Sequence, residues 1–190
     1  MKNKLLLIDG AQTVGKTFLL QNTLRDIKLN KKIINYKFNF AGATNDFYHN
    51  KKSKDFRYGL SLGNDLLLLD LLHKGNIDVI MDRSFLSSIV WGEMDKRTTK
   101  KYIEKYVDYL NNFMYLIDIT LIYIYKDPKN IIIRDRFDGF DDAFSMKLQD
   151  KTYRKYIDKL NFKQVHLFEN KFDKLSVEDF SNIIKGWVKE

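Results

Sequence analysis

The stretch LLLIDGAQTVGKTFLL, residues 5–20, decides the fold that the sequence predicts. Its first apolar residues predict a buried strand, and its last ones predict the start of a helix. Between them GAQTVGKT, residues 10–17, matches the pattern G-x-x-x-x-G-K-[ST] after a strand and before a helix, as phosphate binding requires. The glycines let the backbone wrap closely, so that successive N–H groups point at phosphate oxygens. We therefore expect this segment, the phosphate loop, to bind a nucleoside triphosphate.

Individual residues of the phosphate loop have distinct expected roles. Lys16 would reach the β- and γ-phosphates, and the Thr17 hydroxyl would hold Mg²⁺. The helix that follows adds the positive end of its dipole. The residues expected to contact ATP are Gly10, Thr13, Val14, Gly15, Lys16, Thr17 and Phe18.

The length and composition suit a globular enzyme rather than a disordered chain. The chain has 190 residues, 44% of them hydrophobic and 31% charged, and we expect one domain spanning residues 1–190. No apolar run approaches the roughly 20 residues that cross a bilayer, so no membrane span is expected. The lack of cysteine excludes disulfides and thiolate metal sites and favours a cytoplasmic location.

The net charge of +8 attracts polyanions, either nucleotides or nucleic acid. The charges are spread along the chain rather than concentrated in one block, which favours a general abundance of lysine over a dedicated binding patch. Nucleic acid is therefore a less favoured partner than a small nucleotide.

Apolar runs typical of buried strands alternate along the chain with amphipathic patterns typical of helices. Apolar residues at helical spacing mark helices around residues 20–27, 103–114 and 180–188. The strands are expected at Lys4–Asp9, Ile33–Phe40, Ile77–Asp82, Ile119–Tyr125 and Gln164–Phe168. This alternation predicts a parallel sheet with helices on both faces.

Two helix starts are expected from capping residues. Ser176 followed three residues later by Asp179 is close to a capping box at the start of the last helix. Asp127 and Pro128 are expected to be an N-cap and a first helical residue.

Polar residues gather where three of the predicted strands end. Ligands of such sheets bind at the carboxyl ends of the strands, so the phosphate loop, the segment from Lys37 onward and the pair Asp82-Arg83 would face one crevice. Asp82 can orient Mg²⁺ or its water, and the guanidinium of Arg83 can hold an acceptor phosphate in a bidentate fork. A hydrolase has little use for such an arginine, so the pair favours a phosphotransferase.

A GTPase is weakly supported by the sequence. A guanine-selective domain would normally carry N-K-x-D after a later strand and D-x-x-G after the strand that supplies the magnesium aspartate. The corresponding segments here are YIYKDPKN, residues 123–130, and DRSF, residues 82–85.

A second arginine-containing segment follows the fourth predicted strand. Residues 127–142 include Arg134 and Arg136, and we expect this segment to act as a lid. Phosphoryl transfer needs positive charge near the migrating group, and a closing segment supplies that charge while excluding water. The expected catalytic residues are therefore Lys16, Asp82, Arg83, Arg134 and Arg136.

Three motifs, in this order, resemble the thymidylate kinase group of P-loop nucleoside monophosphate kinases, and the resemblance covers nearly the whole chain. They are GAQTVGKT at residues 10–17, KFNFAGAT at 37–44 and DRSFLSS at 82–88, the last similar to the family's D-R-[YH]-x-x-S. The resemblance implies an α/β, three-layer P-loop NTPase fold with a five-stranded parallel sheet in the order 2-3-1-4-5. It also implies a homodimer, for which the apolar LLLLDLL, residues 66–72, is a candidate seam, although a buried core helix explains that run at least as well.

The resemblance implies an acceptor site as well. Lys37 and Phe38 lie where some members hold the acceptor phosphate with an Arg-Phe-Pro element, although Lys37 replaces the arginine. Arg83 and Ser87 belong to the third motif, in which Ser84 replaces a tyrosine.

The nucleobase of the acceptor is expected near the segment FRYGLSLGNDLL, residues 56–67. Arg57, out of register with the family's arginine, and Asn64 are candidates for a polar contact to the base. Phe56 or Tyr58 would stack on it. Ordinary helix packing explains these residues somewhat better.

Two small-molecule acceptors are open. A nucleoside kinase needs a carboxylate near the end of the second strand as general base; residues 36–44 carry no acid, Asp46 is the nearest, and Asp82 would have to serve magnesium as well. A monophosphate kinase needs cations instead, which Lys37, Arg83 and the lid arginines provide. This difference favours a nucleoside monophosphate, with dTMP as the best single expectation.

The third candidate acceptor is a 5′-hydroxyl polynucleotide end, or a modified base within DNA. Basic and aromatic residues interleave at 96–110 and 151–164, which would suit a nucleic-acid track. Amphipathic helices with lysine-rich outer faces explain these segments better. A non-catalytic ATP-binding switch is also open, but it would gain nothing from Asp82, Arg83 and the lid arginines.

Overall fold

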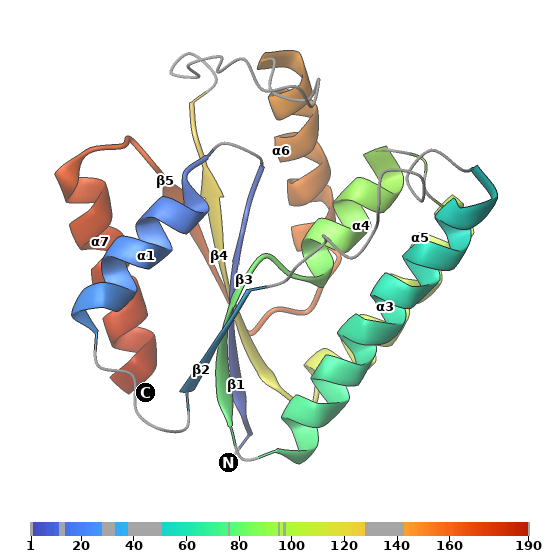
Figure 1. The fold of residues 1–190 in the computed structure, drawn as a ribbon, viewed down its shortest axis with the longest axis horizontal. Helices are drawn as coiled ribbons and strands as arrows, with labels where there is room; N and C mark the ends of the chain where they lie inside the picture. The colour runs from blue at the N-terminus through green and yellow to red at the C-terminus, as the bar shows by residue number, and fades with distance from the viewer. Residues whose placement is uncertain are drawn as a thin grey trace.

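The computed structural model of the chain describes residues 2–11, 14–27, 33–37, 51–75, 77–94, 96, 98–127 and 143–189. For residues 26, 34–37, 51–62 and 143–145 it describes the backbone alone. These parts of the chain form an α/β fold in which a parallel sheet lies between two layers of helices (Figure 1).

The sheet formed by the described residues has five strands in the order β2-β3-β1-β4-β5, the order that the resemblance implies. Every pair of neighbouring strands in it is parallel. The strands are β1 (Lys4–Asp9), β2 (Ile33–Lys37), β3 (Asp78–Asp82), β4 (Asp118–Tyr125) and β5 (Gln164–Glu169). The predicted runs end within one residue of these bounds, except that residues 38–40 lie outside the described residues.

The helices divide between the two faces of the sheet. In Figure 1, α1 and α7 cover one face, and α3, α4 and α5 lie on the other, with α6 packed against α4. Their bounds are α1 (Lys16–Asp26), α3 (Lys51–Lys74), α4 (Phe85–Met94), α5 (Lys100–Met114), α6 (Ala143–Ile157) and α7 (Lys174–Lys189).

Alternate residues of each central strand enter two different cores, which is why the strand sequences are apolar throughout. Strand β1 gives Leu5 and Leu7 to the core under α3, α4, α5 and α6, and Leu6 and Ile8 to the core under α1 and α7. The alternation continues into the polar residues at the carboxyl ends of the strands. Asp9 therefore faces α4 and α6, whereas Asp82 faces α1.

Helix α7 begins two residues before the predicted cap. The Ser176 backbone N–H donates to Asp173 Oδ1 at 2.7 Å, so Asp173 caps the helix. The Ser176 hydroxyl instead accepts from the Lys171 N–H at 3.1 Å. The prediction of Ser176 as N-cap is wrong, because the helix already begins at Lys174 and Ser176 is its third residue, with its N–H bound by the Asp173 cap. The helix start predicted at Pro128 lies outside the described residues.

The apolar run 66–72 lies in α3, where some of its leucines face the core and others face solvent. Leu69 and Leu72 are 1% exposed and belong to the core, whereas Leu67 and Leu71 are 57% and 56% exposed. The run is therefore partly a core helix face and partly an exposed apolar stripe. Within the described part of the chain, no helix combines the length and hydrophobicity needed to cross a bilayer.

Candidate active site

The phosphate loop joins β1 to α1, and its two glycines each meet a steric demand. Gly10 has φ +152°, and a Cβ there would lie 2.1 Å from the carbonyl oxygen of Ile124 in β4. Gly15 adopts the left-handed conformation, with φ 84° and ψ 19°, immediately before α1. The Asn170 side chain, after β5, donates to the Val14 carbonyl at 2.8 Å and so holds the loop from the other side.

Lys16 is folded into the loop. Its side chain is 5% exposed, and Nζ donates to the Gly10 carbonyl at 2.8 Å and the Ala11 carbonyl at 2.5 Å. Burial, together with the positive charge of Arg83, lowers the pKa of Lys16 to about 7, and the carboxylates of Asp9 and Asp82 only partly oppose this shift. Anionic phosphate oxygens in the loop would restore the preference for the charged ammonium.

Thr17 and Asp82 come together at the carboxyl edge of the sheet. The Thr17 hydroxyl, at the start of α1, donates to Asp82 Oδ2 at 3.2 Å. Asp82 is 4% exposed, and its Oδ1 has no hydrogen-bond partner among the described residues. A buried carboxylate oxygen beside a hydroxyl fits Mg²⁺, which prefers oxygen ligands and usually keeps phosphate and water in its remaining positions.

Arg83 turns the chain sharply after β3. It has φ 67°, uncommon for a residue other than glycine, and its N–H donates to the Ile8 carbonyl at 3.0 Å. The turn brings Ser84 back toward β1, where its hydroxyl donates to Asp9 Oδ2 at 2.8 Å and accepts from the Leu86 N–H at 3.1 Å. Ser84 thereby caps α4 and binds Asp9, two tasks that a tyrosine at this position would not perform in the same way.

Asp9 is the centre of a buried hydrogen-bond network, here called the Asp9 network, which comprises Asp9, Gly10, Ser84, Ser87 and Tyr153. Asp9 Oδ1 accepts from the Gly10 N–H at 2.9 Å, the Ser87 hydroxyl at 2.7 Å and the Tyr153 hydroxyl at 3.1 Å. Oδ2 accepts from Ser84 and, at 3.1 Å, from the Ser87 N–H. A fully buried carboxylate needs such a set of donors to replace water.

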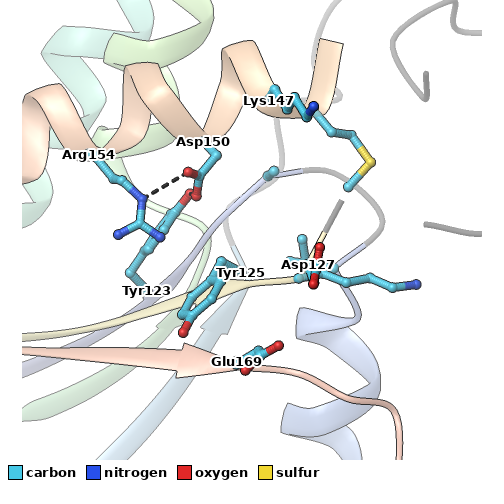
Figure 2. A pocket seen from close by; sticks show the side chains of 11 residues that line it. Tyr123, Tyr125, Asp127, Lys147, Asp150, Arg154 and Glu169 are labelled. Atoms are coloured by element: carbon cyan, nitrogen blue, oxygen red, sulfur yellow. Dashed lines mark hydrogen bonds and ion pairs between the residues drawn. The ribbon is translucent and has the colours of Figure 1, made fainter. Parts of the chain in front are cut away.

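A pocket of about 360 Å³ opens beside the phosphate loop. It lies between the ends of β4 and β5, the loop residues Ala11 and Val14, and the start of α6 (Figure 2). The Arg154 side chain donates to Asp150 at 2.8 Å and lies over the Tyr125 ring, with 5.2 Å from the guanidinium carbon to the ring centre. The lining residues of the pocket that are labelled in Figure 2 are Tyr123, Tyr125, Asp127, Lys147, Asp150, Arg154 and Glu169.

The structure places the predicted residues as follows. Lys16, Thr17, Asp82 and Arg83 lie at one edge of the sheet, and Lys37 is in register with Asp82 on the neighbouring strand. The side chains of Lys37, Phe56 and Arg57 lie outside the described part of the structure, as do Thr13, Phe38, Arg134, Arg136 and residues 128–142 as a whole.

The remaining predicted contacts differ in exposure. Phe18 is 51% exposed beside the loop, and Asn64 is exposed on α3. Ser87, expected at the acceptor, is fully buried, and its hydroxyl contacts Asp9 and Tyr153. Sequence reasoning missed Asp9, Tyr153 and Asn170, and it noted Ser84 as a replaced tyrosine but not as a partner of Asp9. A charged residue ending an apolar strand was the one available signal for the missed residues, and it concerned Asp9 alone.

No family model and no curated protein matches the chain. Among solved structures, deoxyadenosine kinase from M. mycoides with bound dATP is similar, with a TM-score of 0.62, 16% identity and 100% of each chain covered. Thymidylate kinase from Ehrlichia chaffeensis has a TM-score of 0.60 at 14% identity, with 98% of this chain and 100% of that chain covered. Polyphosphate Kinase 2 from Arthrobacter aurescens TC1 has a TM-score of 0.59 at 12% identity, with 95% and 65% covered.

These similarities define the fold of the chain. It is the fold of the thymidylate kinase-like P-loop kinases, so the resemblance seen in the three sequence motifs is confirmed at the level of fold.

Proposed function

We propose that the protein is an ATP-dependent phosphotransferase that transfers the γ-phosphoryl group to a nucleoside monophosphate, with dTMP as the best single acceptor. The observation that carries this proposal is the convergence of Lys16, Thr17, Asp82 and Arg83 at the carboxyl edge of the sheet. A binding module needs the first two of these residues. Asp82 would serve the Mg²⁺ of the donor, whereas the guanidinium of Arg83 beside it is useful where the phosphate of a second substrate is held.

The donor would lie along the phosphate loop. Backbone N–H groups of the loop and the start of α1 would bind its phosphates, and Lys16 would exchange its two carbonyl partners for phosphate oxygens. Thr17 and Asp82 would hold Mg²⁺, which when bound offsets charge on the β- and γ-phosphate oxygens. The pocket in Figure 2 continues from the loop, and the side chains of Tyr125 and Arg154 that line it would contact the nucleoside.

The acceptor phosphate would be held by cations on the other side of the same edge. Arg83 follows Asp82 directly, and Lys37 is paired with Asp82 across β2 and β3. Two phosphates brought into line repel each other, so positive side chains at this position lower the barrier to transfer. The predicted arginines Arg134 and Arg136 would add to this charge from the lid segment.

A deoxynucleoside kinase is the second candidate, because Asp82 has an oxygen without a hydrogen-bond partner among the described residues. That oxygen could accept a proton from a 5′-hydroxyl group, which a monophosphate acceptor does not require. The similar deoxyadenosine kinase structure agrees with this alternative.

An acceptor panel decides between the candidates. The protein would be incubated with Mg·ATP and, separately, dTMP, the other nucleoside and deoxynucleoside monophosphates, deoxynucleosides and oligonucleotides with 5′-hydroxyl ends. We expect a diphosphate product, most of it from dTMP. Product from deoxynucleosides alone would replace the proposal by its alternative, and product from oligonucleotide ends alone would overturn the small-molecule assignment.

Two substitutions test the assigned roles in the same assay. We expect Lys16→Ala to abolish turnover, since the removed ammonium contributes on the order of 3 kcal/mol or more to transition-state stabilisation. We expect Arg83→Ala to raise the acceptor KM about tenfold or more while leaving ATP affinity unchanged. Arg25→Ala, which removes an exposed arginine in the last turn of α1, is the matched control. An unchanged acceptor KM in Arg83→Ala would refute our placement of the acceptor phosphate.

A further inference from the structure

The Asp9 network joins the phosphate loop to a helix far away in sequence. Asp9 is 0% exposed, and its donors come from the loop itself, from the turn after β3, from the first turn of α4 and from α6. Gly10, the first residue of the phosphate loop, is among them. The Asp9 carboxylate therefore binds the first N–H of the loop directly.

Tyr153 is the member of the network that belongs to α6. Its hydroxyl lies 3.1 Å from Asp9 Oδ1 and 2.8 Å from the Ser87 hydroxyl, so its single proton is shared between these two acceptors. The side chain is 1% exposed, and its ring packs against Tyr123 with 5.5 Å between ring centres. Burial and the neighbouring Asp9 carboxylate raise the pKa of Tyr153 well above its usual value, so the hydroxyl stays protonated and remains a donor.

Because of this packing, Tyr153 is not positioned to contact a substrate directly. Neither the hydroxyl nor the ring is accessible to a substrate, and the ring is fixed by β4. Without the hydroxyl, Asp9 Oδ1 would keep only Gly10 and Ser87 as donors, and the carboxylate would shift toward them to recover its solvation. The backbone N–H of Gly10 would move with it.

We propose that Tyr153 is a positioning residue that fixes the phosphate loop in its anion-binding conformation by holding the Asp9 carboxylate. Its ligand, a nucleoside triphosphate, is that of the proposed function, on which this inference rests. The Tyr153 hydroxyl acts on the polyphosphate part of the ligand, because Asp9 contacts the loop and the Ser87 turn but not the pocket beside β4. The Tyr153 ring packs against Tyr123, which lines that pocket, and Tyr153→Phe keeps this ring.

The matched pair Tyr153→Phe and Tyr156→Phe tests this role. Both tyrosines are buried on α6, and each hydroxyl reaches α4: that of Tyr153 through Ser87 and that of Tyr156 through Glu93. Only Tyr153 also touches Asp9. The affinities of Mg·ATP and of magnesium tripolyphosphate would be measured by titration calorimetry, and Tm by thermal unfolding.

We expect Tyr153→Phe to weaken Mg·ATP and magnesium tripolyphosphate by the same factor, about tenfold. Tyr156→Phe should lower Tm but leave both affinities within about twofold of the wild type. Equal affinities in Tyr153→Phe and wild type would overturn the inference. A loss confined to ATP would also overturn it, since Tyr153 would then act on the nucleoside. If wild-type protein binds neither ligand, the proposed function itself fails.

Ser87→Ala gives a second measurement should Tyr153→Phe fold poorly. It removes another donor of Asp9 Oδ1, and we expect a similar loss of tripolyphosphate affinity. Where both variants fold, the double variant should lose less than the product of the two single losses, because both act through one carboxylate. A loss of tripolyphosphate affinity in the double variant equal to the product of the two single losses would contradict the inference that both side chains act through Asp9.

Discussion

Asp65 shows how an incomplete set of donors changes a buried carboxyl group. It lies on α3 and is 1% exposed, and its Oδ2 accepts from the Tyr106 hydroxyl at 2.8 Å and the Ser88 hydroxyl at 3.1 Å. Oδ1 has no hydrogen-bond partner in the described residues. Burial raises the pKa of Asp65 to about 7, and the hydrogen bonds from Tyr106 and Ser88 only partly oppose that shift.

This raised pKa predicts a pH-dependent stability. The folded protein keeps the Asp65 proton up to about pH 7, whereas the unfolded chain releases it near its ordinary pKa of 3.8. The stabilisation from the bound proton is therefore complete in acid and is lost as the pH rises to about 7. Asp65→Asn removes this loss. We expect its free energy of unfolding, relative to wild type, to rise by roughly 2 kcal/mol between about pH 5 and pH 7.

Urea unfolding at several pH values measures this difference. Asp70→Asn is the control, because Asp70 lies on the same helix but pairs with the exposed Lys74 at 2.7 Å. We expect this control to follow the wild-type pH profile. Parallel profiles of Asp65→Asn and wild type would show that Asp65 does not titrate in this range.

At the scale of elements, α4 and α6 are joined by a partly buried ionic contact. Lys155 Nζ donates to the two Glu93 oxygens at 2.6 and 2.7 Å, and the Tyr156 hydroxyl also donates to Glu93. Burial alone would raise the pKa of Glu93, but the hydrogen bonds from Lys155 and Tyr156 outweigh it and lower the pKa. The contact therefore stabilises the fold above the ordinary pKa of a glutamate and is lost as the pH falls through the lowered value.

Glu93→Gln should destabilise the protein at neutral pH by about 1 kcal/mol, since the side chains of the pair are 36% and 39% exposed and solvent screens them. The comparison is Glu104→Gln on α5, whose pair with Lys100 spans 3.7 Å with both side chains exposed. We expect less than about 0.5 kcal/mol there. Denaturant unfolding at about pH 7 measures both values, and equal effects would mean that the Glu93 interaction contributes no more than the exposed pair on α5.

The elements were predictable where a repeated apolar pattern defines them. The continuous apolar runs of β1 and β4 must be buried on both faces of the strand, and the apolar stripe of α7 on one face of the helix. Few other structures would bury these residues in this way. The N-cap of α7 was not predictable from the sequence, because the side chains of Ser176 and Asp173 can both cap a helix. The path of the chain before α7 decides which of these two side chains accepts from a backbone N–H in the first turn of the helix.

At the scale of the whole molecule, the face formed by α3 and α5 carries exposed apolar residues. Leu67 and Leu71 of α3 are more than half exposed, as are Tyr102 and Tyr109 of α5. The homodimer implied by the sequence resemblance stays a prediction, and this face is where we expect it. Burial of such side chains contributes roughly 25 cal/mol for each Å² of apolar surface.

Leu71→Glu tests that prediction. A charge at the seam would be buried without a partner in a symmetric dimer, so we expect wild type to sediment as a dimer and the variant as a monomer. Leu175→Glu, on the exposed face of α7 across the sheet, should leave the mass unchanged. Sedimentation velocity distinguishes these cases, and a monomeric wild type at all concentrations would contradict the homodimer.

The site was predictable only in part, because its residues differ in how locally they are specified. Lys16 and Thr17 follow from one contiguous motif, and Asp82 from its place at the end of an apolar strand. Tyr153 lies 144 residues from Asp9, and nothing in its surrounding sequence distinguishes it from the other tyrosines of an amphipathic helix. Its role arises from the packing of α6 against α4, which brings the tyrosine to Asp9.

A residue of the phosphate loop can be required for folding or for action on the ligand, and the closeness of Gly10 to β4 shows that Gly10 is required for folding. A side chain at Gly10 would collide with the Ile124 carbonyl whether or not a ligand is present, whereas the Thr17 side chain is exposed. In a library of single substitutions sorted by cellular abundance alone, changes at Gly10 would be depleted and changes at Thr17 retained. Sorting the same library by catalytic output would remove both. The two selections together would divide the motif into residues that build the loop and residues that act on what it binds.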